Sequence, residues 1–328
     1  MKIIVTGGAG FIGLHTVELL LEQRHEVVIV DNLGEGTRTF PGAKAALYPI
    51  DIGSEHLADI FAAERPDAVI HLAAQVSVQR SLENPSADAR HNIVGTVNLL
   101  KQCADYGVSK LVFASSAAVY GNAAMLPIHE GEGAEPLSFY GASKKMAEHY
   151  IRLFSERYGL NYTILRYANV YGMRQNTRGE SGAAASFVKQ LLEGGRPHIN
   201  GSGEQTRDFI YVKDVAAANA AALAHGDCET LNIGSGRRTS VNELFRLVSR
   251  ICGREELTPE YRPALPGDIQ DSLLDNRRAL RTLPWEPAYS LLDGLTETIR
   301  YEQELRGERR EERREERLSE AARAGLYF

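Results

Sequence analysis

The sequence has few of the features that mark secreted, metal-binding or membrane proteins. It contains three cysteines in 328 residues, Cys103, Cys228 and Cys252, and no two of them form a C-x-x-C pair. We therefore expect neither a disulfide framework nor a zinc site, and we expect a reducing, cytoplasmic setting. No apolar run approaches the length that spans a bilayer.

A strong charge of one sign is also missing. Lys and Arg total 37 and Asp and Glu total 43, so the formal net charge is -6. A mildly acidic chain has no general attraction for nucleic acid or anionic membranes, and we predict neither as a partner. His71, His129 and His198 have no metal-ligand spacing to another histidine or cysteine, so no metal is predicted.

Short apolar runs alternate with longer helical patterns in the first half of the chain. The runs predict strands at residues 2–6, 26–30, 46–50, 68–71, 110–114 and 162–166. The intervening patterns predict helices at residues 11–22, 54–63, 87–106 and 140–158. This alternation predicts an α/β fold, a doubly wound parallel sheet of Rossmann type with helices on both faces.

After about Tyr171 the pattern changes to glycine-rich loops, shorter helices and clustered prolines. We expect a cofactor-binding domain over residues 1–171, its sheet completed by parts of 205–235. Residues 172–301 should mainly form a smaller, interleaved substrate domain, and residues 302–328 a charged helical tail. Within 308–317 five glutamates and five arginines cancel, which favours a solvated helix.

A glycine turn follows the first predicted strand and opens the first predicted helix. Gly7, Gly10 and Gly13 have the G-x-x-G-x-x-G spacing, with Phe11 and Ile12 inside it. Glycines let backbone N–H groups approach a pyrophosphate and let helix pack closely on strand, and the helix N-terminus favours the negative charge. The turn therefore predicts a dinucleotide site.

Asp31 and Asn32 follow the second predicted strand, at the distance where an acidic residue binds the adenosine ribose. A carboxylate at this position accepts hydrogen bonds from the ribose hydroxyls and repels a 2′-phosphate, which favours NAD over NADP. A turn formed by the Asp-Asn pair is the simpler alternative. Arg38 lies nearby and could bind a phosphate, which leaves NADP open.

Tyr140 and Lys144 are four residues apart, a spacing that puts both side chains on one face of a helix. We expect the Lys144 ammonium to lower the Tyr140 pKa, so that the phenolate can take a proton from an alcohol. A hydroxyl at the end of strand 110–114 could bind the same oxygen, and Ser116 is the choice. The neighbouring Ser115 leaves this assignment open by one residue, and a strand-end cap or a surface Tyr–Lys pair are the simpler alternatives.

In this order and spacing, these residues resemble the extended short-chain dehydrogenase/reductase family. The resemblance continues in further motifs and covers residues 1 to about 301: Asp51-Ile52, Leu72-Ala73-Ala74, residues 118–121, residues 165–172 and residues 205–209. It implies an NAD-dependent 4-epimerase of a UDP-sugar, which oxidises carbon 4 to a transient ketone and reduces it on the other face.

The resemblance also assigns roles. Asp51 and Ile52 would flank the adenine, Leu72 to Ala74 would line the pyrophosphate and ribose channel, and Asn92 would hold the cofactor from the next helix. Ser115 and Tyr167 would also contact the cofactor, Tyr167 against the nicotinamide. The substrate would be bound by Ser116, Tyr140, Asn169, Arg207, Asp268 and Ser272. For single residues there are simpler alternatives: Asn92 and Asn169 could be buried structural amides, and Arg207 could pair only with Asp208.

Two positions bear on the substrate. Members of the family commonly have an arginine that binds the nucleotide diphosphate, three residues before the Asp of a Gly-Asp pair. In this sequence the pair is Gly267-Asp268, and the position of the arginine is occupied by Leu265. Arg262 is the nearest residue that could substitute for it. In the family, the residue seven places after that arginine lines the hexose pocket, and a small residue there admits N-acetyl groups. The matching residue in this sequence is Ser272. We therefore expect turnover of UDP-N-acetylglucosamine as well as UDP-glucose.

Other functions stay open. A UDP-glucuronate 4-epimerase would need Arg174 or Arg178 to face a carboxylate, whereas a dehydratase would need an acid where Ala117 and Ala118 stand. A non-catalytic dinucleotide sensor on the same fold is the alternative of another class. The family usually pairs through two long helices, which predicts a homodimer through residues 87–106 and 140–158.

Overall fold

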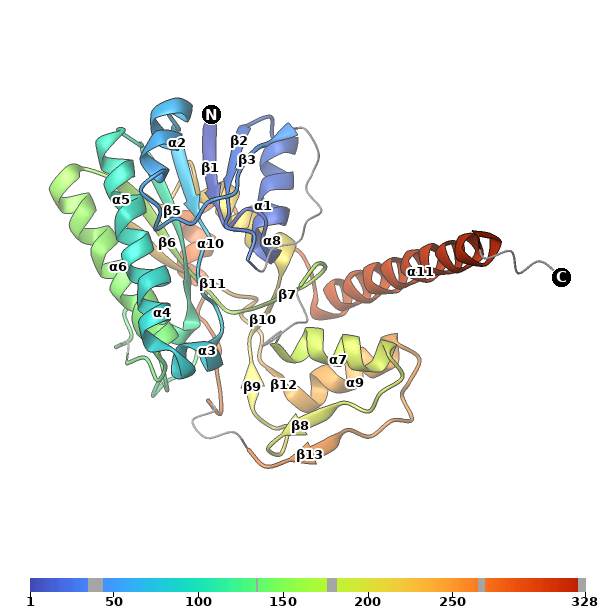
Figure 1. Ribbon diagram of the computed structural model, residues 1–328. Helices are drawn as coiled ribbons and strands as arrows, with labels where there is room; N and C mark the ends of the chain where they lie inside the picture. Colours follow the sequence, from blue (N-terminus) through green and yellow to red (C-terminus); the bar gives the residue numbers. More distant parts are fainter. Residues whose placement is uncertain (35–43, 134, 176–181, 265–268, 324–328) are drawn as a thin grey trace.

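The computed structural model describes residues 1–34, 44–133, 135–175, 182–264 and 269–323, and side chains as far as residue 307. Four residues that entered the predictions lie outside this description: Arg38, Arg178, Leu265 and Asp268. A seven-stranded sheet in the order β11-β6-β5-β4-β1-β2-β3 forms the larger part of the molecule (Figure 1).

All neighbouring strands of this sheet are parallel. The strands are β1 (Lys2–Thr6), β2 (Glu26–Val30), β3 (Ala46–Tyr48), β4 (Ala68–His71), β5 (Lys110–Ser116), β6 (Asn161–Tyr167) and β11 (Glu229–Ile233). The strand order reverses at β1, between β2 and β4, and ligands of such sheets bind beyond the carboxyl ends of the strands at this point. The predicted doubly wound parallel sheet is confirmed.

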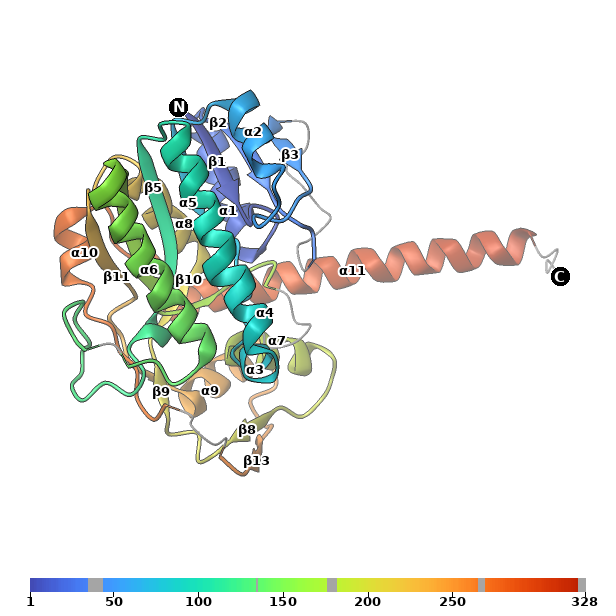
Figure 2. The same cartoon turned by 60° about the vertical axis from the view of Figure 1, so that its left-hand side comes forward.

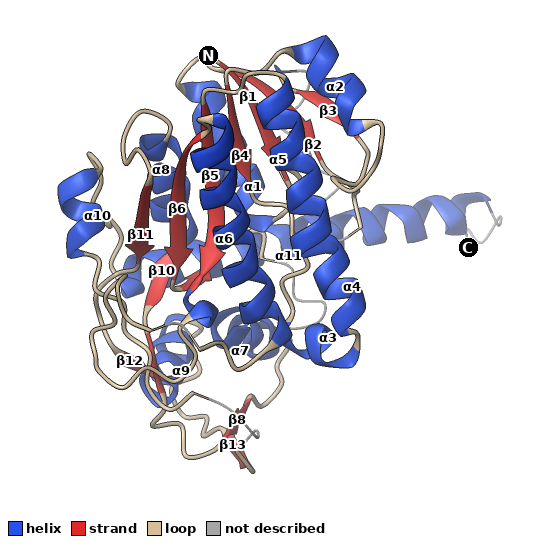
Figure 3. Cartoon of the chain, turned by 90° about the vertical axis from the view of Figure 1, so that its left-hand side faces the viewer, coloured by secondary structure: helices blue, strands red, loops and turns tan. Residues whose placement is uncertain are grey.

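Helices cover both faces of the sheet (Figures 2 and 3). One face packs against α1 (Phe11–Glu22), α8 (Val212–Ala222) and α10 (Arg277–Thr282). The other packs against α2 (Leu57–Glu64), α5 (Gly95–Asp105) and α6 (Phe139–Tyr158). Alternate residues of each central strand enter opposite core clusters, as with Ile3 and Ile4 of β1, which explains why these strands are continuously apolar.

The boundaries differ from the prediction at several elements, most of all in the predicted strand 46–50 and the predicted helices 54–63 and 87–106. The predicted strand 46–50 ends at Tyr48, and the predicted helix 54–63 begins at Leu57. The predicted helix 87–106 consists of α4 (Pro85–Ala89), a π-helical turn (Arg90–Val94) and α5. The short helices α3 (Val78–Glu83) and η3 (Ala117–Val119) were not predicted.

The parts of the chain after Tyr167 that do not join the sheet or cover its faces build a second region below the sheet (Figure 1). It contains α7 (Gly182–Leu192), α9 (Val241–Ile251) and three two-stranded pairings. These join β7 (Asn169–Tyr171) to β10 (Phe209–Tyr211), β9 (Thr206–Arg207) to β12 (Thr239–Ser240), and β8 (His198–Asn200) to β13 (Glu260–Arg262).

The last helix, α11 (Leu291–Arg323), begins against the second region and then points away from the body of the protein (Figure 1). Leu295 and Ile299 of this helix are buried in a core cluster with residues of α7 and α9. Its first turns therefore belong to the second region, and the charged segment predicted to be helical lies on its outer part.

Candidate active site

The glycine turn has the geometry that a pyrophosphate site needs. Gly7 has φ +69°, and a Cβ on it would lie 2.6 Å from the Ala73 nitrogen. A Cβ on Gly13 would lie 2.1 Å from the Gly7 carbonyl oxygen. Among the described side chains none caps the first turn of α1, and that turn has no acidic residue. Its N–H groups and the helix dipole therefore face an anion site.

Asp31 at the end of β2 is 8% exposed, and both carboxylate oxygens accept backbone hydrogen bonds. Oδ2 accepts from Ala9 N at 3.0 Å, and Oδ1 accepts from Leu33 N at 2.8 Å. Asp31 thereby joins the glycine turn to the loop after β2. Each oxygen retains a lone pair for a ribose hydroxyl.

Asp51, Ile52 and Asn32 lie together in the loops beyond β2 and β3. Asn32 Nδ2 donates to Asp51 Oδ2 at 2.9 Å, and Gly53 N donates to Asp51 Oδ1 at 2.8 Å. Ile52 packs against Gly95 at the start of α5. The structure thus brings these three residues together, and their contact with the adenine end of the cofactor stays a prediction.

The segment Leu72–Ala74 leaves β4 directly beside the glycine turn. Leu72 N donates to Thr6 O at 3.0 Å, and Ala73 N donates to Thr6 Oγ1 at 3.3 Å. The Thr6 hydroxyl also contacts His71 Nδ1 at 2.7 Å, and His71 Nε2 contacts Thr96 Oγ1 at 2.9 Å. Burial, and secondarily the nearby Lys144, lower the pKa of His71 to about 3, so this imidazole is neutral and structural.

Asn92 lies in the π-helical turn before α5, and such turns are frequent at functional sites. Its Oδ1 accepts from Gln75 N at 2.8 Å, and its Nδ2 donates to Gln75 O at 2.9 Å. Nδ2 also contacts Ser143 Oγ of α6 at 3.0 Å. Asn92 thus connects the cofactor-side loop after β4 to the helix that carries Tyr140 and Lys144.

The two serines at the end of β5 point to different partners. Ser115 Oγ donates to Glu148 Oε1 at 2.6 Å, and Ser115 is buried. The Ser116 hydroxyl accepts from Ala118 N at 3.1 Å and lies close enough to the Tyr140 phenol to lower its pKa. The geometry therefore favours Ser116 over Ser115 as the hydroxyl that acts with Tyr140.

Gly141 makes this contact between β5 and α6 possible. A Cβ on Gly141 would lie 2.4 Å from Ala118 O, so only glycine lets the start of α6 approach the loop after Ser116 this closely. Ser138 caps the helix by accepting from Gly141 N at 3.1 Å.

The pKa predicted for Tyr140 was wrong. Burial raises the pKa of the Tyr140 phenol to about 12; the Ser116 hydrogen bond lowers it and the Asp88 charge raises it. Lys144 does share a face of α6 with Tyr140, but its ammonium donates to Ala114 O at 2.8 Å and lies 4.9 Å from the centre of the Phe113 ring. Burial lowers the pKa of Lys144 to about 8. The spacing predicted a shared face but not the larger effect of desolvation.

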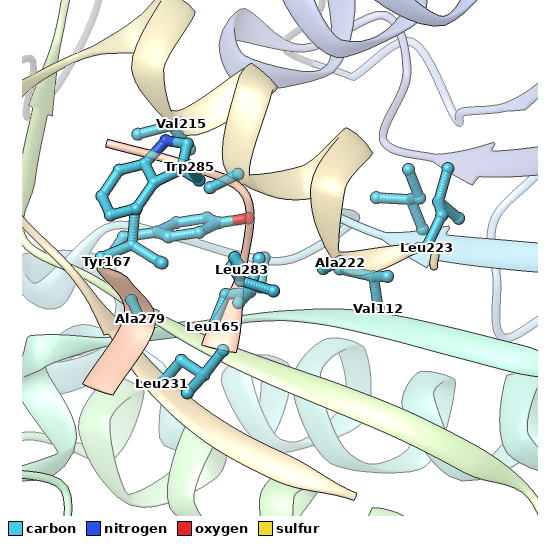
Figure 4. Close-up of a cluster of buried hydrophobic side chains, with 14 of the residues drawn as sticks. Val112, Leu165, Tyr167, Val215, Ala222, Leu223, Leu231, Ala279, Leu283 and Trp285 are labelled. Carbon is cyan, nitrogen blue, oxygen red and sulfur yellow. The ribbon is translucent and has the colours of Figure 1, made fainter. Parts of the chain in front are cut away.

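Tyr167 lies beside Ser116 in the register of β5 and β6. Its ring belongs to the core cluster that includes Trp285 and Leu283 (Figure 4), and its hydroxyl donates to Asn219 Oδ1 at 2.5 Å. The side chain is 5% exposed. Contact between Tyr167 and the nicotinamide stays a prediction.

Segments 205–208 and 269–274 of the second region run side by side. Thr206 N donates to Gln270 O at 2.9 Å, and Ser272 N donates to Thr206 O at 3.1 Å. The neighbouring side chains also meet, because Thr206 Oγ1 donates to Asp271 Oδ1 at 2.5 Å across a sequence separation of 65 residues. Arg207 and Ser272, the residues next to this pair, therefore lie near each other.

Asp208 is committed to backbone groups rather than to Arg207. Its carboxylate accepts from Ser235 N at 2.8 Å, Ser235 Oγ at 2.6 Å, Gly236 N at 3.3 Å and Leu274 N at 3.4 Å. Burial raises the pKa of Asp208 in spite of these bonds. The alternative that Arg207 pairs only with Asp208 therefore receives no support from the carboxylate's described contacts.

A small, open hollow lies beside Asn169 between β7 and the start of α7. Gln175 lines it, and among the described residues its Oε1 atom is buried without a hydrogen-bond donor. An unsatisfied buried acceptor is costly, so a ligand or water should supply the donor. Gln175 was not predicted, although it lies only three residues after the motif at residues 165–172.

Arg174 pairs with Glu18 of α1 at 2.7 Å, which turns its charge away from this hollow. In the described part of the chain, no cluster of three His, Cys, Asp or Glu side chains could hold a metal ion. Likewise, none of the described helices is long and apolar enough to cross a membrane.

A parallel sheet with a glycine turn, an acidic residue after β2 and a Ser–Tyr–Lys group at the same edge is typical of dinucleotide-dependent enzymes. The family model of the NAD dependent epimerase/dehydratase family matches residues 3–234. The chain belongs to the NAD dependent epimerase/dehydratase family, and the predictions of this resemblance and of NAD as the cofactor are confirmed.

Similar proteins support the same class. The chain is 37% identical to a UDP-glucose 4-epimerase of Mycolicibacterium smegmatis over 308 residues, 92% of this chain and 98% of that protein. It superimposes on a UDP-glucose 4-epimerase of Thermotoga maritima with bound UDP-glucose at a TM-score of 0.91, with 44% identity and 93% and 99% of the two chains covered. A UDP-N-acetylglucosamine 4-epimerase of Methanobrevibacter ruminantium, in complex with UDP-N-acetylmuramic acid, matches at a TM-score of 0.88, with 34% identity and 93% and 98% covered.

Proposed function

We propose that this protein is a 4-epimerase of a UDP-sugar and keeps NAD as a resident cofactor. The observation that carries the proposal is the place of the Ser116 hydroxyl next to the Tyr140 phenol at the carboxyl edge of the sheet, with Lys144 on the same helix as Tyr140. This group lies where a sugar hydroxyl can meet both a proton acceptor and the cofactor region.

NAD fits the residues present. Gly7 and Gly13 pack so closely on neighbouring backbone that neither could carry a side chain, so the turn would present its backbone to the pyrophosphate. Asp31 keeps lone pairs for the ribose. Asn32, Asp51 and Ile52 would form the adenine end of the NAD site. When bound, NAD supplies the acceptor and later the donor of the hydride at carbon 4, together with a positive charge near the reacting oxygen.

The residues of the chain move the proton and hold the sugar. Tyr140 accepts the proton of the 4-hydroxyl, and Ser116 donates a hydrogen bond to the same oxygen. Arg207 and Asn169 bind the diphosphate, so that the 4-keto sugar can turn about this link and present its other face. Tyr140 then returns the proton, and no net oxidation occurs.

The substrate range follows from Ser272. Ser272 lies beside Thr206, and a small side chain at this position would leave space for an N-acetyl group, so the protein should accept UDP-N-acetylglucosamine as well as UDP-glucose. The uronate alternative loses Arg174, which is paired with Glu18. A dehydratase lacks its acid, because Ala117 and Ala118 follow Ser116 in η3.

The proposal includes a homodimer formed by the π-turn and α6. Val94 is 59% exposed, and Met146 and Leu153 on one stripe of α6 are each 44% exposed. An apolar surface of this kind on neighbouring helices suits an isologous interface. Sedimentation should give a dimer for the wild type and a monomer for Met146→Glu with Leu153→Glu.

The direct test is an assay without added cofactor. The purified protein is incubated with UDP-glucose, UDP-N-acetylglucosamine or UDP-glucuronate, and the C4 epimers are separated and measured. We expect epimers of the first two sugars, and a loss of about 10²–10⁴-fold in rate for Tyr140→Phe with bound NAD retained. No epimer from the wild-type protein would contradict the proposal and favour the dinucleotide sensor.

A further inference from the structure

Two buried carboxylates act on Lys144, and they differ in what balances their charge. Glu148, one turn along α6, accepts from Arg166 Nη2 at 2.7 Å and Arg166 Nε at 2.8 Å, and also from Arg152 Nη2 at 3.1 Å. Asp88 of α4 is 1% exposed, and its described hydrogen bonds come from two neutral amides. The negative charge of Asp88 is therefore left to act on the groups around it.

Asp88 is also the centre of a hydrogen-bond network that reaches the site. Its Oδ1 accepts from Gln75 Nε2 at 2.9 Å and from Asn92 Nδ2 at 3.1 Å. Asn92 Nδ2 contacts Ser143 Oγ, which donates to Tyr140 O at 2.9 Å. A chain of hydrogen bonds thus runs from Asp88 to the backbone of Tyr140, and a second contact holds Gln75, the residue after Leu72–Ala74.

The groups that face Lys144 come from four elements. Asp88 lies on α4, Glu148 on α6 and the neutral His71 on β4, while β5 supplies the Ala114 carbonyl and the Phe113 ring. Burial lowers the pKa of Lys144, and Asp88 is the first of the two carboxylates that oppose this. Tyr140 faces Ser116, Asp88 and Tyr167.

We propose that Asp88 is a positioning residue of the reaction: its carboxylate holds Asn92 and Gln75 in place and supplies a negative charge that stabilises the Lys144 ammonium, one turn along α6 from Tyr140. This inference rests on the proposed function. It assigns Asp88 no contact with substrate or cofactor, because the residue acts through Asn92 and Lys144.

Asp88→Asn separates the charge from the hydrogen bonds. The amide keeps one oxygen that accepts from Gln75 and Asn92, but it removes the negative charge. Lys144 then loses its proton at lower pH and Tyr140 ionises at lower pH, so both limbs of the rate profile should move to lower pH by about one pH unit. Asp88→Glu keeps the charge and should keep the wild-type profile, with a lower kcat because Asn92 is displaced.

Asp214→Asn is the matched control, because Asp214 is a buried aspartate bound by the backbone of Ala288 and Tyr289, far from Lys144 in the sequence and on α8. It should reduce stability without moving the rate profile. A profile of Asp88→Asn that coincides with the wild type would overturn the proposal and leave Asp88 a structural role only.

A titration that needs no turnover separates this proposal from the proposed function. Tyrosinate absorbance is followed with pH in the NAD-loaded wild type and in Asp88→Asn, each with and without Tyr140→Phe. We expect one tyrosine to ionise at lower pH in Asp88→Asn, and this difference to vanish in the Tyr140→Phe background. A shift without epimerase activity contradicts the proposed function alone, whereas activity without a shift contradicts the role of Asp88.

Discussion

The sheet region and the second region place their site residues in different ways. In the sheet region each contribution follows a strand: Gly7 follows β1, Asp31 follows β2, Leu72 follows β4 and Ser116 ends β5. In the second region Arg207 and Ser272 meet because short segments pair across a large separation in sequence.

This difference indicates which region determines cofactor binding and which determines sugar binding. The sheet has apolar cores on both faces, so its edge is a rigid platform that the strand order alone produces. The second region is tied at its site by polar contacts, above all those of Asp208 with residues 234–236 and Leu274. We therefore expect cofactor retention and sugar recognition to be separable by mutation, and the following experiments test this from the largest expected effect to the smallest.

Gly13→Ala should remove the cofactor. Its Cβ would lie 2.1 Å from Gly7 O, so the turn and the helix must separate at a cost of at least about 2 kcal/mol. The NAD content of the purified protein should fall to zero and turnover with it. Gly107→Ala is the matched control, since Gly107 has φ +68° and nothing within 4 Å of an added Cβ; it should cost about 1 kcal/mol and keep NAD. Retention of NAD by Gly13→Ala would break the comparison.

Ser272→Tyr should change the sugar without changing the cofactor. A bulky ring beside Thr206 removes the space for an acetyl group, so kcat/KM for UDP-N-acetylglucosamine should fall by about 10–200-fold. Turnover of UDP-glucose and NAD content should stay as in the wild type, and Ser272→Ala should behave as the wild type with both sugars. Equal losses with both sugars would mean that Ser272 does not line the sugar pocket.

Asp208→Asn should loosen the second region alone. In the wild type the carboxylate of Asp208 accepts hydrogen bonds from several donors. The amide group of the variant would turn its own N–H groups toward some of these donors, which should lower the free energy of unfolding by about 1–3 kcal/mol. We expect a raised KM for the UDP-sugar at full NAD content, measured by steady-state kinetics and calorimetry. Asp214→Asn should lower the melting temperature without raising the KM. A loss of NAD from Asp208→Asn would show that the two regions are not separable.

Acid should act first on the sheet region. The pKa of His71 falls from 6.5 to about 3 on folding, so the unfolded chain alone takes up this proton as the pH drops below 6.5. The stability that neutral His71 contributes is present above pH 6.5 and is lost at up to about 1.4 kcal/mol per pH unit toward pH 3.

His71→Gln removes this proton uptake and keeps a group that can bond Thr6 and Thr96. Denaturant unfolding between pH 7 and pH 5 should therefore show a smaller loss of stability for the variant than for the wild type. Burial raises the pKa of Asp208 and Asp214, so their effect has the opposite sign and favours the folded state at low pH. Equal slopes for His71→Gln and the wild type would contradict the assignment of the acid response to His71.

The sequence was sufficient for features that depend on neighbours in the chain. The glycine spacing predicted the turn, the position of Asp31 after a strand predicted its place at the sheet edge, and the spacing of Tyr140 and Lys144 predicted a shared helix face. Each depends on the periodicity of one element, which local residues set. The N-terminal strands and helices were predicted for the same reason.

It was not sufficient where burial or distant partners decide. The pKa of Tyr140 rises because the phenol is desolvated, an effect of several elements closing around it. The choice between Ser115 and Ser116 depends on Glu148, and the charge near Lys144 depends on Asp88; neither carboxylate has a sequence pattern that marks it. Gln175 was overlooked because only the folded structure shows that it lines the hollow beside Asn169.

The sequence by itself determined the class of the sheet, the glycine turn that receives NAD, and the tyrosine and lysine on one face of a helix, because strand and helix periodicity and chain order are local properties. The tertiary structure decided which serine faces Tyr140, which carboxylates surround Lys144 and how Ser272 comes to lie beside Thr206. These depend on desolvation and on contacts between segments far apart in the chain, which no local pattern encodes.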